Sequence, residues 1–306
     1  MTQNPQDNPE TSSQRQGFER YPGWKQMRKK RNAQLDEAYL LNKDKFEQAF
    51  QEIDRFCLFI GYPRSGHTIV GSLLDAHPNI IIAHEQDVLE YIRRGVQKKE
   101  LYHFLLNNSQ RHGQNREDLA NTGKEKEYSY NVPNQWQGRF QKLKVIGDNK
   151  GGSTSRQLGE DISLLETTSN IVNKPIDFIH VIRNPYDNIA SILVRGQGDW
   201  SSPEFCIKKY FSLCEIVERV QKKVAVEQFH QLRHEDFIVN PQETLTKLCE
   251  FLGQSAPEDY LCDCASIVFA SPNKTRTKIQ WKPEEIERIQ AEMEKFDFLK
   301  GYSFTD

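Results

Sequence analysis

The feature that most constrains the fold is an apolar run that passes through a glycine turn into a helix. The run FCLFI (56–60) has the length and continuity of a strand buried on both faces. Gly61 and Gly66 follow, and then the segment TIVGSLLDA (68–76) repeats its apolar residues at helical spacing before Pro78. A strand, a tight turn and a helix in this order are the unit from which parallel α/β sheets are built.

Further apolar segments predict the other strands of such a sheet. Each is rich in Val and Ile, and segments with helical periodicity separate them. We predict strands in NIIIA (79–83), LKVIG (143–147) and DFIHVI (177–182), and a weaker one within QFHQLRHEDF (228–237). The predicted fold class is therefore α/β, with a central parallel sheet flanked by helices and a phosphate-loop architecture similar to that of nucleoside triphosphate hydrolases.

The chain of 306 residues predicts one folded domain after a short arm. Residues 1–23 are rich in Asn, Gln, Ser and Pro, so we predict a disordered arm there and a single domain over residues 24–306. The polar stretch at about 94–141 is predicted to be an insertion of helices and loops beside the sheet. Two roles stay open for this stretch: it selects a substrate, or it is a solvent-exposed segment without a binding role.

Composition excludes several classes of function. The net charge of −2 and the pI near 6.5 provide no basic field, so no nucleic-acid partner is expected. No window approaches the ~20 apolar residues of a membrane span, and the N-terminus lacks a signal-peptide core, which predicts a cytoplasmic protein without stable membrane insertion. The cysteines show no disulfide framework, and Cys262 with Cys264 lacks the second ligand pair of a zinc site, so no metal is expected. A homodimer stays open.

The glycine turn has the spacing of a phosphate loop. In G-x-x-x-x-G-x-T, backbone N–H groups of the turn and the helix N-terminus converge on an anion, and the Thr68 hydroxyl can donate as well. A nucleotide hydrolase or kinase needs Lys where His67 stands, which argues against ATP or GTP hydrolysis. Arg64 supplies a cation within the loop, with a fork of donors suited to an oxyanion. The alternative is an ordinary strand-to-helix turn with a surface arginine.

A second candidate anion site follows the strand 177–182. Arg183 stands directly after it, and a helix that carries Ser191 begins at Pro185. Ligands of parallel α/β sheets bind outside the carboxyl ends of the strands, so Arg183 is expected on the same rim as the glycine turn. Two anion-binding features on one rim indicate a ligand with two separate anionic groups.

These segments resemble the sulfotransferases that use 3′-phosphoadenosine 5′-phosphosulfate. YPRSGHT (62–68) resembles the 5′-phosphosulfate loop of that family, and RNPYDNIAS (183–191) resembles its 3′-phosphate motif. Residues 232–253 and 273–289 resemble the acidic turn with its helix and the loop that closes over the nucleotide. The resemblance covers about residues 56–289 and implies the sulfotransferase version of the phosphate-loop fold, with the phosphosulfate as co-substrate.

The resemblance also implies the donor-binding residues. They are Arg64, Ser65, Gly66, His67, Thr68, Arg183, Ser191, Lys274 and Arg276. Lys278 is a further basic residue of the closing loop, and the alternative for that loop is a solvated basic segment. The arginine at position 64 is more similar to the tyrosyl-protein and carbohydrate branches than to the cytosolic phenol and steroid branch. His67 departs from that last branch as well, and its task is left unassigned.

The catalytic residues implied by the resemblance are Glu85, Arg64 and Lys150. Glu85 falls where those branches carry a glutamate base. The strand 79–83 also brings His84 to the same rim, and alternation lets only one of the two face the site. We favour Glu85, because a carboxylate beside cations can accept a proton. Lys150 either neutralises the bridging oxygen of the leaving nucleotide or is a turn lysine.

The hypothesis is transfer of a sulfuryl group from the phosphosulfate to an acceptor hydroxyl, by positioning and electrostatics and without a metal. The acceptor is a small molecule, a carbohydrate or a lipid. Two alternatives stay open. One is a small-molecule or nucleoside kinase of related fold, and the other is a non-catalytic protein that binds the sulfonucleotide.

Overall fold

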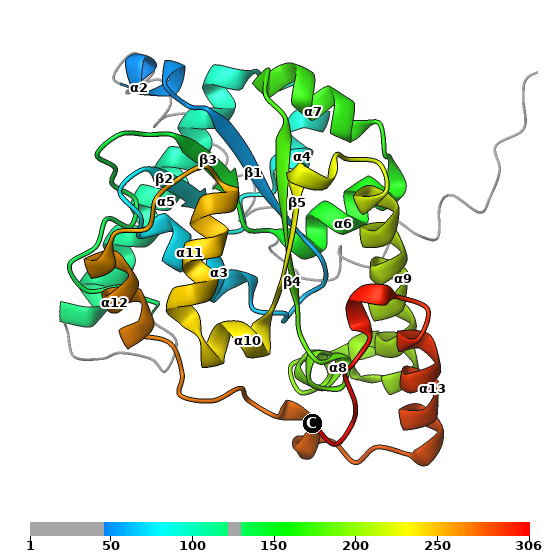
Figure 1. Ribbon diagram of the computed structural model, residues 1–306. Coiled ribbons are helices and arrows are strands. Elements are labelled where there is room, and N and C mark those ends of the chain that lie inside the picture. The colour runs from blue at the N-terminus through cyan, green and yellow to red at the C-terminus, as the bar shows by residue number, and fades with distance from the viewer. Residues whose placement is uncertain (1–45, 122–129) are drawn as a thin grey trace, which may run out of the picture.

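The computed structural model describes residues 46–121 and 130–306. Within those residues the strands form one sheet, parallel throughout, in the order β2-β3-β1-β4-β5 (Figure 1). The strands are β1 (Arg55–Ile60), β2 (Ile80–Ala83), β3 (Val145–Asp148), β4 (Ile176–Ile182) and β5 (Phe229–Arg233). The predicted strands and the α/β class are confirmed. The arm predicted over residues 1–23 lies outside the described residues.

The continuous apolar run of β1 is explained by its central place in the sheet. β1 pairs with β3 on one side and with β4 on the other, so that Leu58 lies opposite Asp148 and Phe178. Its side chains alternate between two cores: Phe56, Leu58 and Ile60 enter one, and Cys57 and Phe59 enter the other. Both faces are thus covered, and a polar residue has no place on either.

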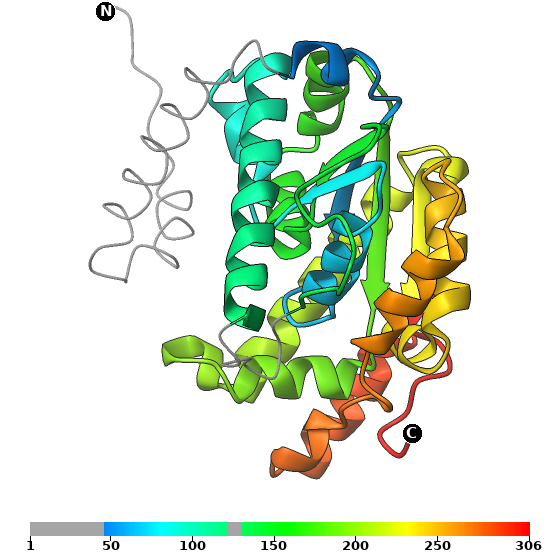
Figure 2. The same cartoon turned by 90° about the vertical axis from the view of Figure 1, so that its left-hand side faces the viewer.

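Helices form a layer on each face of the sheet. Figure 2 shows the sheet nearly edge-on, with the long teal helix on one side and the yellow and orange helices on the other. The first layer contains α2 (Glu47–Gln51), α4 (Val88–Arg93), α5 (Lys98–Asn121), α6 (Gly151–Glu160), α7 (Leu164–Val172) and α9 (Pro203–Gln221). The second contains α3 (His67–Asp75), α10 (His234–Val239), α11 (Pro241–Phe251) and α12 (Glu258–Ser266). A third core joins α8 (Pro185–Leu193), α9 and α13 (Pro283–Met293).

The stretch predicted as a polar insertion is partly a core element. α5 spans Lys98–Asn121, and Leu101, Tyr102 and Leu105 in its first half are fully buried in the first core. These apolar residues occupy only the N-terminal part of a long helix. The average composition of residues 94–141 is therefore polar, although part of this stretch belongs to the core. Residues 98–121 therefore form the crossover helix between β2 and β3, whereas 122–129 lie outside the described residues.

The segment 228–237 also divides differently from the prediction. β5 ends at Arg233, and α10 begins at His234. Among the described residues, no helix combines the length and the apolar character needed to cross a bilayer. The six cysteines are all unpaired, and Cys264 is buried whereas Cys262 is exposed, so the two side chains of the C-x-C do not converge.

Candidate functional site

The candidate residues follow the carboxyl ends of neighbouring strands. Glu85 comes after β2, Lys150 after β3, the glycine loop after β1 and Arg183 after β4. The strand order therefore places Glu85 and Lys150 on one side of the loop and Arg183 on the other. Neighbouring strands lie about 4.8 Å apart, so one ligand of nucleotide size can reach the whole rim.

The glycine loop is held from inside the protein. Gly66 precedes α3 with φ of 110°, a backbone conformation that favours glycine, and a Cβ there would lie 2.5 Å from Cδ2 of His234. The Ser65 hydroxyl donates to the carbonyl of Tyr62 at 3.1 Å. The Asn188 amide, in the orientation that satisfies both of its groups, donates to Pro63 O at 2.9 Å and accepts from Ser65 N at 3.2 Å. α8 and α10 thus fix the shape of the loop, while Thr68 in the first turn of α3 stays partly exposed.

His67 is a buried ring beneath the loop. It packs edge-on against Phe59 with 5.7 Å between ring centroids, and its Nε2 lies 3.1 Å from the Ser65 hydroxyl. Burial lowers the pKa of His67 to about 4, although the charge of Glu85 opposes that shift. The ring is therefore neutral near pH 7. His67 cannot supply the positive charge that lysine provides at this position in nucleotide hydrolases.

Arg64 connects the loop to the second motif. Its side chain is exposed, and its Nε lies 3.4 Å from the hydroxyl of Ser191 on α8. Its carbonyl accepts a hydrogen bond from Nη1 of Arg183 at 3.2 Å. The two segments that the sequence singled out are thus brought together, 119 residues apart in the chain.

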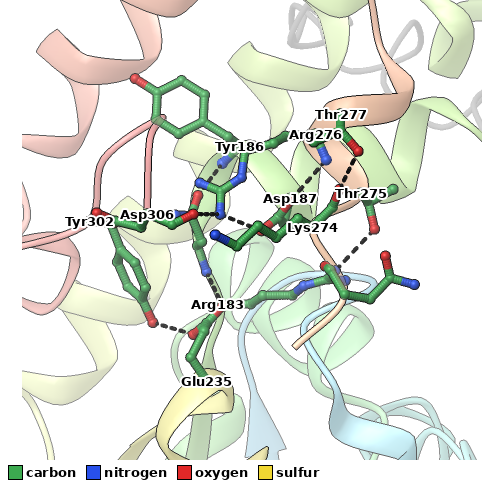
Figure 3. Close-up of polar contacts among 12 residues, drawn as sticks. Arg183, Tyr186, Asp187, Glu235, Lys274, Thr275, Arg276, Thr277, Tyr302 and Asp306 are labelled. Atoms are coloured by element: carbon green, nitrogen blue, oxygen red, sulfur yellow. Dashed lines mark hydrogen bonds and ion pairs between the residues drawn. The ribbon is translucent and has the colours of Figure 1, made fainter. Parts of the chain in front are cut away.

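Arg183 is gripped by the loop that precedes α13. Only 8% of the residue is exposed. Its Nη2 donates to the carbonyl of Asn273 at 2.7 Å and to the hydroxyl of Thr275 at 3.1 Å (Figure 3). The segment 273–278, which ends in the short 3-10 helix η5 (Thr275–Lys278), therefore lies on the corner of the rim formed by Arg183.

Arg276 lies differently from the expectation that it binds phosphate. The residue is buried, and its Nη2 forms an ion pair with Asp187 at 3.1 Å. The guanidinium also donates to the carbonyls of Ser303, Phe304 and Asp306. Arg276 is turned toward α8 and the segment 303–306, so its contacts are with the protein. Lys274 and Lys278 of the same loop are exposed.

Glu85 and Lys150 form an ion pair at the other side of the loop. Nζ of Lys150 lies 3.3 Å from Oε2 of Glu85, and about half of the glutamate side chain is exposed. Partial burial raises the pKa of Glu85, but the charges of Lys150 and His84 outweigh burial, and the net pKa lies below its usual value. The carboxylate is therefore ionised at neutral pH and able to accept a proton.

His84 diverges from Glu85. Its ring packs against His112 of α5 with 4.6 Å between centroids, and its backbone N–H donates to Asn108 Oδ1 at 2.7 Å. Burial lowers the pKa of His84. At this end of the rim Glu85 therefore pairs with Lys150, whereas His84 packs against α5.

Two residues that no motif singled out hold the segment around Glu85. Asn149 Oδ1 accepts from the backbone N–H of Glu85 at 2.9 Å. The buried Asp148 accepts from the N–H groups of Gln86 and Asp87 at 2.8 and 2.9 Å, and burial raises its pKa to about 6. The available signal was the polar pair Asp148–Asn149 at the end of an apolar strand segment, because buried polar groups require partners.

Comparison with known proteins links part of the chain to one family. Residues 175–258, which include β4, α8 and β5, match the sequence model described as "Sulfotransferase family". No curated protein matches the sequence.

Solved structures of similar fold include several sulfotransferases. The sulfotransferase domain from the curacin biosynthetic pathway superposes with a TM-score of 0.50 at 15% identity, covering 80% of this chain and 98% of that one. The sulfotransferase domain from the Synechococcus PCC 7002 olefin synthase has a TM-score of 0.45 at 18% identity, covering 78% and 88%. A mouse sulfotransferase complexed with PAP has a TM-score of 0.36 at 12% identity, covering 79% and 74%. The likeness to the curacin-pathway domain shows a shared fold.

Proposed function

We propose that the chain transfers a sulfuryl group from 3′-phosphoadenosine 5′-phosphosulfate to an acceptor hydroxyl, and the match of residues 175–258 to the sulfotransferase family model supports this proposal. The observation that carries the proposal is the arrangement along the rim. Arg64 and Arg183 meet at the glycine loop, and the Glu85–Lys150 pair lies on the other side of that loop. Cations for a doubly anionic donor and an ionised carboxylate for an acceptor thus share one rim.

In this proposal the donor lies across the loop. The loop amides, Arg64 and Thr68 bind the phosphosulfate, because helix N-termini and guanidinium groups stabilise oxyanions. Arg183 and Ser191 bind the 3′-phosphate, with Lys274 as an exposed cation at the edge of that site.

The transfer step follows from these positions. Glu85 takes the proton of the acceptor hydroxyl while its oxygen attacks sulfur in line. The bond between sulfur and the bridging oxygen breaks, and the departing nucleotide keeps the electron pair as a 5′-phosphate oxyanion. Lys150 and Arg64 stabilise that developing charge, which is worth several kcal/mol in a preorganised site. The step balances without a metal or a redox partner.

The kinase alternative has weaker support. A phosphate-loop kinase uses the lysine at position 67 to neutralise the terminal phosphates of ATP. Here a neutral, buried histidine occupies that position, and no contact described for His67 places another positive charge at the same point.

The test begins with ligand binding. Thermal shift and calorimetry compare 3′,5′-adenosine bisphosphate with ATP and magnesium, and the bisphosphate is expected to stabilise the protein more. If the bisphosphate does not stabilise the protein, the proposal is refuted. Tight binding of the bisphosphate without transfer to any acceptor in a cell extract would instead establish the non-catalytic alternative.

The role of the base is tested by Glu85→Gln. The amide keeps the shape but cannot accept a proton, so we expect labelled-sulfate transfer to fall at least about a hundredfold with unchanged affinity for the bisphosphate. Glu250→Gln, at an exposed position of α11, is the matched control and should leave turnover unchanged. Turnover of Glu85→Gln equal to that of the control would remove Glu85 from the mechanism. Small-molecule, carbohydrate and lipid alcohols are the acceptor classes to screen.

A further inference from the structure

We infer that Arg276 and Asp187 are positioning residues for Arg183: their buried ion pair holds the segment 273–278 so that it orients the Arg183 guanidinium toward the donor. The inference rests on the proposed function, since it assumes that Arg183 binds the 3′-phosphate. It replaces the expectation that Arg276 touches the phosphate itself.

The ion pair fixes both the side chain and the backbone of Arg276. Nη2 of Arg276 lies 3.1 Å from Asp187 Oδ2, and the two side chains are only 5% and 4% exposed. The backbone N–H of Arg276 donates to Asp187 Oδ1 at 2.8 Å. One carboxylate in the first turn of α8 thus holds the 3-10 helix η5 at two points. Removing one partner of such a buried pair leaves the other without compensation, which is costly.

The same short segment carries the acceptors of Arg183. Thr275 precedes Arg276 directly and accepts from Arg183 Nη2 through its hydroxyl, as the carbonyl of Asn273 does. On the opposite side, Nη1 of Arg183 donates to the carbonyl of Arg64. These three contacts define the plane of the guanidinium between the glycine loop and the segment 273–278. Any shift of Arg276 therefore moves two of the three.

A second set of contacts holds Arg276 from the other side. Its Nη1 donates to Ser303 O at 2.9 Å, and its Nη2 donates to Asp306 O at 2.8 Å. Asn184, the residue after Arg183, donates from its amide to the same Ser303 carbonyl at 2.9 Å. Figure 3 shows Arg276 between Asp187 and Asp306 on the far side of Lys274 from Arg183. The segment 303–306 therefore ties Arg276 to the start of α8.

Glu235 completes this support. It accepts from the backbone N–H of Asn184 at 2.9 Å and from the hydroxyl of Tyr302 at 2.7 Å. The turn that carries Arg183 is thus anchored from α10 as well as from the segment 302–306. Asp187 and the segment 303–306 both contact Arg276, and through Arg276 they hold the segment 273–278 in place.

The experiment is a double-mutant cycle on nucleotide affinity. Calorimetry measures the dissociation constants of 3′,5′-adenosine bisphosphate and of adenosine 5′-phosphate for the wild type, Arg183→Ala, Arg276→Gln and the double variant. We expect Arg276→Gln to weaken the bisphosphate about tenfold, the scale of a hydrogen bond to a charged group, while adenosine 5′-phosphate changes less than twofold. The double variant should bind no more weakly than Arg183→Ala alone, because both changes remove one interaction.

Three outcomes would overturn the inference. Losses that multiply in the double variant would mean that Arg276 contacts the phosphate independently. Equal losses for both nucleotides, or a lower melting temperature with unchanged affinities, would mean a structural role only. Arg55→Gln is the matched control and should change neither constant, because Arg55 also pairs with a buried aspartate, Asp177 at 3.0 Å, but lies at the start of β1, away from the rim.

A gentler variant covers the case in which Arg276→Gln fails to fold. Thr275→Val keeps the shape but removes one acceptor of Arg183, so the bisphosphate should weaken about threefold to tenfold with adenosine 5′-phosphate unaffected. An unchanged bisphosphate constant in Thr275→Val would contradict the inference. A wild type that binds neither nucleotide would instead refute the proposed function, so the two failures are distinct.

Discussion

At the scale of single residues, strain marks the candidate site. Arg64 and Glu85 have φ angles of 71° and 50°, in the left-handed region that side chains other than glycine rarely adopt. Each is held there by a contact: Arg183 binds the carbonyl of Arg64, and Asn149 binds the N–H of Glu85. Such conformations cost of order 1–3 kcal/mol and persist where the surroundings enforce them. The two residues assigned to charge stabilisation and proton transfer are therefore among the six described non-glycine residues with positive φ.

The pH dependence of transfer tests the link between Lys150 and Glu85. Only ionised Glu85 can accept a proton, and the charge of Lys150 is the largest influence that lowers its pKa. In Lys150→Met the pKa of Glu85 should rise, so activity should be lost at a higher pH as the solution is acidified. We expect the acid limb of the kcat/KM profile to move up by about one unit. Lys142→Met, an exposed lysine paired with Glu52, is the control, and coincident acid limbs would contradict the pairing.

At the scale of elements, the site depends on how α6 meets the glycine loop. The first residues of α6 lie directly against it: a Cβ on Gly151 would overlap the ring of His67, and one on Gly152 would lie 3.2 Å from Cδ of Pro63. His67 thus fills the space between the loop and α6 and gives this position a packing role. The requirement for glycine at 151 comes from this close approach.

Replacing these two glycines tests the packing role of His67. Gly151→Ala should displace the histidine ring and destabilise the protein by about 1–3 kcal/mol, the usual cost of overpacking a core. Gly152→Ala adds the same methyl group one residue later, where a small shift of the Pro63 ring can make room for it. This variant should change stability by less than about 1 kcal/mol. Urea denaturation gives both values. Equal stability of the two variants would show that His67 does not wedge the loop.

The helices also show where local patterns mislead. The amphipathic helices α9 and α11 can be recognised from the sequence alone, because their apolar residues recur at helical spacing along the whole length. α5 was placed in a polar insertion, since the apolar residues that it contributes to the core are confined to its first half. Whether such a helix covers the sheet depends on the neighbouring layer, which no single segment encodes.

At the scale of the whole molecule, burial holds several histidines neutral beneath the rim. Burial lowers the pKa of His67 to about 4, and those of His180 and His234 to about 3. An unfolded chain binds protons on these rings near pH 6.5, whereas the folded protein does not. The stability that they contribute is therefore present above about pH 6.5 and is lost as the pH falls toward 4 for His67 and toward 3 for His180 and His234. Asp75 and Asp148, whose pKa burial raises to about 6, act in the opposite direction.

A single variant isolates one histidine from these opposing groups. His180 is fully buried, and burial lowers its pKa to about 3. Because the unfolded chain takes up a proton on this ring near pH 6.5 and the folded protein does not, the free energy of unfolding should fall by about 2 kcal/mol between pH 7.5 and pH 5 on account of His180. His180→Gln cannot take up a proton, so it should lose about that much less stability than the wild type between these pH values. Urea denaturation at both pH values measures the difference. A gap between the two proteins that stays constant with pH would refute the assignment.

The sequence by itself determined the strands, the glycine loop and the rim positions of Glu85, Lys150 and Arg183. These follow from local patterns: a buried parallel strand needs apolar residues on both faces, and ligands meet the ends of such strands. The tertiary structure decided the rest. Arg276 became a partner of Asp187, 89 residues away, and His67 became a buried wedge. The charge of an arginine is visible in the sequence, but which anion it meets is set by packing between segments that the sequence does not place side by side.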